Sequence, residues 1–98
     1  MSNTKNIMTN NGRLIAQNGT YVVNDTTEYV ANAEGYYMAE DTVIARIEVN
    51  GVTGTDAKDD YISTAATALK GGVLLTPLGD DYFSAITLTS GSVTVILK

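Results

Sequence analysis

The chain has 98 residues, which is enough for one domain with a small core. It contains no cysteine, histidine or tryptophan, so disulfide frameworks, thiolate metal sites and the most common general base are all excluded. A formal net charge of −5, from 6 basic and 11 acidic residues, argues against partners such as nucleic acid and anionic membranes. We therefore expect no enzyme activity, no cofactor and no metal.

The first segment, residues 1–12, is rich in Asn and Thr and is interpreted as an arm before a single β-domain at 13–98. It lacks an apolar core of signal-peptide length, and no other run reaches the roughly 20 apolar residues of a membrane span. We expect synthesis in a cytoplasm. Extended, such an arm reaches about 40 Å, so it either docks on a neighbouring subunit, as we expect, or packs on its own domain. The candidate contact residues in the arm are Asn3, Lys5, Ile7 and Met8.

Turn dipeptides such as Asn18-Gly19, Asn50-Gly51 and Ser90-Gly91 divide the chain into short runs rich in Val, Ile, Thr and Tyr. The first two runs, 13–17 and 20–24, form a predicted hairpin across Asn18-Gly19. Short runs of this kind, separated at regular intervals by turn dipeptides, are typical of an all-β domain.

The next runs, 27–33 and 35–41, contain three candidate interaction residues, Tyr29, Tyr36 and Tyr37. Tyrosine rings stack on sugars and anchor protein interfaces. Neighbours on a strand point to opposite faces, so one ring of Tyr36 and Tyr37 is expected in the core and the other at the surface.

Residues 42–50 alternate between apolar and polar types and predict a half-buried strand. One face would hold Val43, Ala45, Ile47 and Val49, and the other Ile44, Arg46 and Glu48. The stretch 55–70 combines apolar residues at helical spacing with many Thr and Ser, so a short helix and a loop with an edge strand both stay open. Pro77, the only proline, marks an edge or a bend.

The last two runs, 84–89 and 92–98, form a predicted closing hairpin at Ser90-Gly91. Both faces of the final run are nearly apolar, which predicts a central strand or one between layers. Seven or so short strands without a long helix favour a small β-sandwich, or a jelly-roll-like or barrel domain.

Acidic pairs occur at Glu40-Asp41, Asp59-Asp60 and Asp80-Asp81, and carboxylates of this kind chelate calcium or act in glycosidases. Adjacent side chains on a strand diverge, however, so one pair does not converge on one atom. We interpret the pairs as solvated turn residues.

The closing segment "GGVLLTPLGDDYFSAITLTSGSVTVILK" resembles the end of many short structural proteins of tailed bacteriophages, in which a pattern of Gly, Val, Phe, Ile-x-Leu and Ser-Gly-x-Val closes a small β-domain. The matching positions are Gly72, Val73, Gly79, Phe83, Ile86, Leu88, Ser90, Gly91 and Val93.

The resemblance implies a non-enzymatic virion protein, such as a capsid decoration protein, that binds the major capsid protein or another virion protein and often forms trimers. An acidic chain suits the outer head surface, because like charge would oppose packaged DNA inside. The alternative is a carbohydrate- or receptor-binding module of a tail or fibre that uses Tyr29, Tyr36 or Tyr37.

Overall fold

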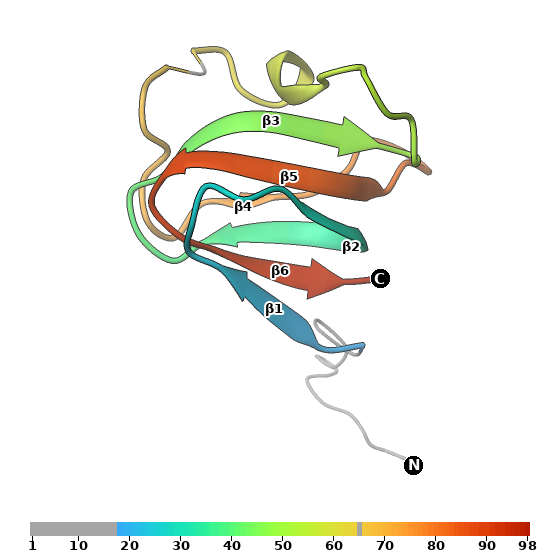
Figure 1. The fold of residues 1–98 in the computed structure, drawn as a ribbon, viewed down its shortest axis with the longest axis horizontal. Helices are drawn as coiled ribbons and strands as arrows, with labels where there is room; N and C mark the ends of the chain where they lie inside the picture. Colours follow the sequence, from blue (N-terminus) through green and yellow to red (C-terminus); the bar gives the residue numbers. More distant parts are fainter. Residues whose placement is uncertain (1–17, 65) are drawn as a thin grey trace.

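The computed structural model describes residues 18–64 and 66–98 and shows an all-β fold (Figure 1). The strands are β1 (Thr20–Val23), β2 (Tyr29–Met38), β3 (Val43–Val49), β4 (Leu74–Leu75), β5 (Phe83–Ser90) and β6 (Val93–Leu97). They form one antiparallel sheet in the order β1-β6-β2-β5-β3, with β4 paired to β2. The predicted all-β class is confirmed. The N-terminal arm and the predicted strand at 13–17 lie outside the described residues.

The sheet folds over at β2, which bends in its middle. The first part of β2, at Tyr29 and Val30, pairs with β5, whereas Gly35–Met38 pairs with β6. The register shifts on both sides of Ala33, and Figure 1 shows the strand turning back there. The result is two layers: β3, β5 and the first part of β2 on one side, and β1, β6, β4 and the second part of β2 on the other. The two layers share β2 and so belong to one hydrogen-bonded sheet. Whether the domain is a sandwich, a jelly roll or a barrel stays a prediction.

The predicted closing hairpin is wrong, because β5 and β6 do not pair with each other. Both pair with β2 instead, and the connection through Ser90, Gly91 and Ser92 carries the chain from one layer to the other. A turn dipeptide predicts a reversal of the chain but does not say whether the next strand stays in the same layer. The central position of the last strand is confirmed: β6 lies between β1 and β2, with Val93 and Val95 fully buried.

The core lies between the two layers and is built from apolar side chains of every long strand. It contains Val23, Ala33, Tyr36, Met38, Ile44, Ile47, Ile62, Phe83, Ile86, Leu88, Val93 and Val95. Burial of these side chains is the main favourable contribution to folding of a chain that has no disulfide.

Strand β3 is present as predicted, but its two faces differ from the simple alternation. Ile44 lies opposite Leu88 and Arg46 lies opposite Thr87, so the register shifts at Ala45. A bulge of this kind puts one extra residue on one strand and changes which face the next side chains occupy. Ile44 and Ile47 are consequently both buried, whereas Ala45, predicted on the same face as Ile47, is exposed.

In the stretch 55–70, the described residues 55–64 and 66–70 form a loop with one turn of 3-10 helix, η1 (Lys58–Asp60), and an isolated bridge between Thr42 and Leu69. It covers the outer edge of β3, where Ala57 N donates to Ile47 O at 2.7 Å and Ile47 N donates to Asp56 Oδ1 at 3.1 Å. Pro77, predicted to mark an edge or a bend, lies in the connection between β4 and β5, outside both strands. Within 18–64 and 66–98, no helix is long and apolar enough to cross a membrane.

Candidate interaction surface

Tyr36 and Tyr37 lie next to each other on β2 and face opposite sides, as predicted. Tyr36 is 1% exposed, and its ring stacks on Phe83 with the centroids 4.4 Å apart and the planes at 11°. Burial, with a smaller contribution from Tyr29, raises the pKa of the Tyr36 hydroxyl well above its usual value. Tyr36 therefore has no exposed ring to offer a partner, which corrects its inclusion among the candidate residues.

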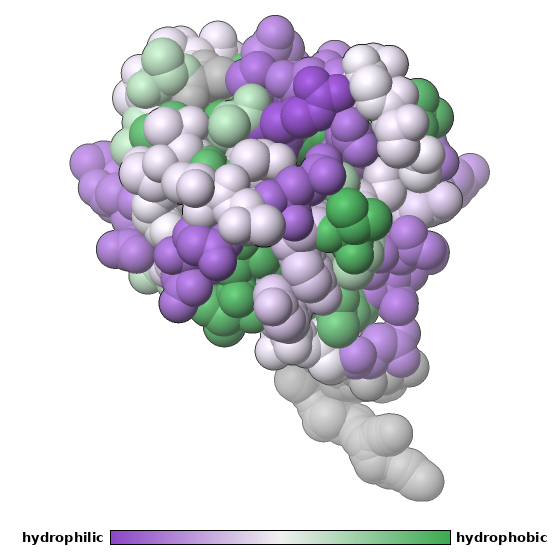
Figure 2. Space-filling model, in the orientation of Figure 1, coloured by the Kyte–Doolittle hydropathy of each residue, from purple (hydrophilic) through white to green (hydrophobic). Residues whose placement is uncertain are grey.

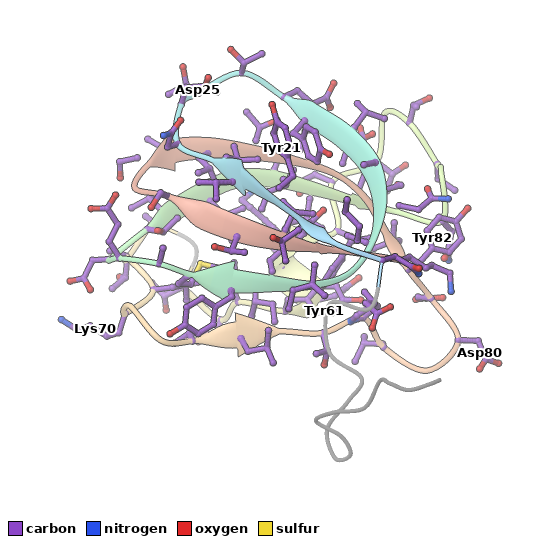
Figure 3. All side chains as sticks on the ribbon, turned by 90° about the horizontal axis from the view of Figure 1, so that it is seen from below. Tyr21, Asp25, Tyr61, Lys70, Asp80 and Tyr82 are labelled. Carbon is purple, nitrogen blue, oxygen red and sulfur yellow. The ribbon has the colours of Figure 1, made fainter. Side chains whose placement is uncertain are left out.

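Tyr29 is half-buried and forms a stacked pair with Tyr21, whose ring centroid lies 4.1 Å away at an interplanar angle of 3°. Figure 3 shows Tyr21 pointing from β1 toward the first part of β2. The pair thus joins the two layers beside the connection from β1 to β2. The sequence did not point to Tyr21, because only the fold of β2 brings Tyr29 over β1.

A small hollow of about 130 Å³ lies beside this stacked pair. It is lined by Tyr21, Val22, Val23, Asn24, Asp25, Thr27, Glu28 and Tyr29. Asp25 is already engaged in the local turn, because its Oδ1 accepts a hydrogen bond from Thr27 N at 3.0 Å. The hollow thus combines two tyrosine side chains with polar side chains.

A row of side chains crosses the outside of the layer formed by β1, β6, β2 and β4. Val22 lies opposite Thr94, Thr94 opposite Tyr37, and Tyr37 opposite Leu74. Directly opposed residues in a sheet point to the same side. Val22 is 54% exposed, Tyr37 44% and Leu74 46%, so the row presents apolar surface to solvent.

The neighbouring row on this side consists of Thr20, Ile96 and Gly35, which the same pairing places side by side. Ile96 and Gly35 are buried, so we call the other, exposed or half-exposed positions on this side the outer face: Thr20, Val22, Tyr37, Leu74 and Thr94. None of them is charged, although the chain has 11 acidic and 6 basic residues. On the side drawn in Figure 2, by comparison, hydrophobic surface lies in separated patches between hydrophilic side chains.

Two of the acidic pairs, Glu40-Asp41 and Asp80-Asp81, lie in connections between strands, as interpreted from the sequence, whereas Asp59 and Asp60 belong to η1. Asp41 Oδ1 accepts a hydrogen bond from Gly71 N at 3.0 Å, and Asp81 Oδ1 accepts one from Asn50 Nδ2 at 2.9 Å. Lys70, near Asp41, and Asp80 lie at opposite ends of the molecule in Figure 3. In the part of the chain that the structure describes, no three His, Cys, Asp or Glu side chains gather as metal ligands would.

The four candidate contact residues of the arm, Asn3, Lys5, Ile7 and Met8, lie outside the described residues. Of the tyrosine candidates, Tyr37 belongs to the outer face and Tyr29 to the hollow, so the fold separates them. Comparisons with protein-family models, with curated proteins and with solved structures found no match.

Proposed function

We propose that this chain is a non-enzymatic virion protein that decorates the outer surface of a bacteriophage head and stabilises it. The observation that carries the proposal is the outer face, an uncharged and partly apolar surface on a small acidic domain. Its partner would be the major capsid protein or another virion protein, and copies would associate as a homo-oligomer. The trimer that the resemblance implies stays a prediction.

The residues behind the resemblance have structural roles that are compatible with the proposal. Phe83, Ile86, Leu88 and Val93 belong to the core, and Gly91 lies in the crossover between layers. The residues of the pattern thus pack the core and form the connection between the layers. Contact with a capsid would use exposed residues that are not part of this pattern, such as Val22 and Tyr37.

The mechanism would be mass action. A protein that binds only the assembled shell lowers the free energy of that shell and not of its dissociated subunits. An outside position agrees with the net charge of −5, because packaged phosphates would repel an acidic protein inside the head.

The test is co-sedimentation of the purified chain with empty shells of the major capsid protein from the same genome. We expect saturable occupancy by the full chain and loss of occupancy when residues 2–11 are deleted, because the arm is proposed to bridge subunits. Circular dichroism of the deletion variant checks that the β-domain is folded. Absence of binding by the folded full chain overturns the proposal. Unchanged occupancy without residues 2–11 contradicts only the role of the arm in binding.

A carbohydrate- or receptor-binding module is the second candidate, and the hollow beside Tyr21 and Tyr29 favours it. Protein sites for sugars combine aromatic rings with polar side chains that bind hydroxyl groups, and this hollow has both. A glycan array would show saturable binding that is lost in Tyr29→Ala and kept in Tyr37→Ala. Equal loss in both variants, or no binding at all, contradicts a sugar site in the hollow.

A further inference from the structure

We infer that Asn50 is a deamidation site that the fold protects, and that its conversion to aspartate opens a clamp between the end of β3 and the start of β5. The inference goes beyond the proposed function and does not depend on it. Asparagine is chemically labile, most of all before glycine, which has no side chain to shield its backbone nitrogen. The chain has three Asn-Gly pairs, at 11–12, 18–19 and 50–51, and the last lies in the turn after β3.

The turn holds Asn50 in a conformation that few residues adopt. Its φ is 57°, that of Gly51 is 72°, and Val52 N donates to Val49 O at 3.0 Å. Positive φ at both central positions is the pattern of a type I′ turn, which asparagine followed by glycine favours. Within 18–64 and 66–98, Asn50 is the only residue other than glycine with a positive φ. The turn thus accounts for an Asn-Gly pair at this position despite its lability.

The amide group of Asn50 is bonded at both its nitrogen and its oxygen. Nδ2 donates to Asp81 Oδ1 at 2.9 Å, and Oδ1 accepts a hydrogen bond from Tyr82 N at 3.1 Å. The backbone is bonded to the same segment, because Asn50 N donates to Tyr82 O at 2.9 Å. Figure 3 shows Tyr82 at the same end of the molecule as Asp80. We call these hydrogen bonds between Asn50 and residues 81–82 the clamp.

Deamidation requires the amide to leave the clamp. The backbone nitrogen of Gly51 attacks Cγ of Asn50 and loses its proton to water, while Nδ2 takes up a proton and leaves as ammonia, so that a cyclic succinimide forms. Water then opens the ring at either carbonyl carbon and leaves aspartate or isoaspartate at position 50. When Cγ becomes tetrahedral, Oδ1 and Nδ2 leave the plane in which they bond to Tyr82 and Asp81. The rate is therefore lowered by the fraction of molecules in which the clamp is open.

Aspartate does not restore the clamp once it has formed. A carboxylate at position 50 still accepts a hydrogen bond from Tyr82 N, but it has no N–H to donate to Asp81. At neutral pH two carboxylates would then face each other at hydrogen-bonding distance and repel. Isoaspartate also adds a carbon to the backbone of the turn. Modification thus separates the end of β3 from the segment before β5, and refolding does not reverse it.

The first test compares deamidation of Asn50 in the folded full chain and in a synthetic peptide of residues 46–55, at the same pH and temperature. Mass spectrometry after proteolysis separates this site from the other Asn-Gly pairs. We expect the folded chain to react at least about tenfold more slowly, which corresponds to about 1.4 kcal/mol for opening the clamp. Asp81→Ala should raise the rate in the folded chain about threefold to tenfold, the equivalent of one hydrogen bond. Asp80→Ala is the matched control, because it removes the same charge from the adjacent residue and should leave the rate unchanged.

Equal rates in the folded chain and the peptide would overturn the inference. A faster reaction in the folded chain would also overturn it, because the N–H of Tyr82 would then stabilise the oxyanion and not protect the amide. Equal effects of Asp81→Ala and Asp80→Ala would contradict the role of the hydrogen bond and indicate an effect of charge alone. Thermal unfolding checks that each variant is folded.

An exchange of the two side chains tests the effect of the product, and it replaces Asp81→Ala if that variant does not fold. Asn50→Asp should lower the midpoint of thermal unfolding at neutral pH. Adding Asp81→Asn should restore most of the loss, because the amide at position 81 then donates to the carboxylate at position 50. Losses that simply add in the double variant would show that the two side chains are not coupled, which contradicts the clamp.

Discussion

Gly91 is the residue on which the crossover between the layers depends most directly. It has φ of 91°, and an added Cβ would lie 2.6 Å from Asp41 O and 2.7 Å from Thr42 Cα, in addition to meeting Thr42 Oγ1. Those backbone atoms cannot move aside independently, because Thr42 Oγ1 donates a hydrogen bond to Glu40 O at 2.8 Å and accepts one from Ser92 N at 3.2 Å. Glycine is therefore required at this position for space as well as for conformation.

Gly91→Ala should lower the free energy of unfolding by about 3 kcal/mol or more, the sum of left-handed strain and overpacking. Gly72→Ala is the control, because Gly72 has a similar φ of 96° but no atom within 4 Å of an added Cβ. It should cost only the conformational strain, about 1–2 kcal/mol. Urea unfolding of both variants measures the difference, and equal losses would show that the crossover is not tightly packed.

At the scale of elements, the loop at 55–62 protects β3 through Asp56. Its Oδ1 accepts hydrogen bonds from Ile47 N and Lys58 N, and its Oδ2 is paired with Lys58 Nζ. Partial burial alone would raise the pKa of the Asp56 carboxyl. The hydrogen bonds from Lys58 and Ile47 outweigh it and hold that pKa below its usual value.

A lowered pKa in the folded state means that ionised Asp56 stabilises the fold above its unfolded pKa, and that this stabilisation is lost as pH falls through the folded pKa. Asp56→Asn keeps an acceptor oxygen but removes the charge. At pH 7 it should lower the free energy of unfolding by about 0.5–1 kcal/mol, and in acid, once Asp56 is protonated in the folded state, the two proteins should converge. Urea unfolding across this pH range measures the gap, with Asp80→Asn as an exposed control; a gap that persists in acid contradicts the assignment.

The sequence predicted some strands of the fold better than others, and the differences have physical reasons. Composition and turn spacing predicted the all-β class, and the apolar character of both faces predicted that β6 is central. Local patterns did not predict the bulge at Ala45 or the bend of β2, because both depend on packing between the layers. For the same reason local patterns did not predict the pairing of Tyr21 with Tyr29 or the alignment of Val22 with Tyr37 and Leu74, because both follow from how β2 bends and which strands it pairs with.

For the whole molecule, the net charge of −5 opposes the association of copies that is part of the proposed function. If the centres of charge of two copies are about 25 Å apart, their repulsion in water is about 4 kcal/mol before screening. The Debye length falls from about 30 Å at 0.01 M salt to about 8 Å at 0.15 M, so salt removes most of this repulsion. An apolar contact has no interfacial ion pairs for salt to weaken.

Pairing should therefore become about tenfold tighter when the salt concentration is raised from about 0.01 M to about 0.15 M. A contact made by salt bridges would respond in the opposite direction, so the sign of the change identifies the kind of interface. Sedimentation equilibrium at the two concentrations measures it. Weaker pairing of the natural chain in the higher salt would show that charged residues hold the copies together.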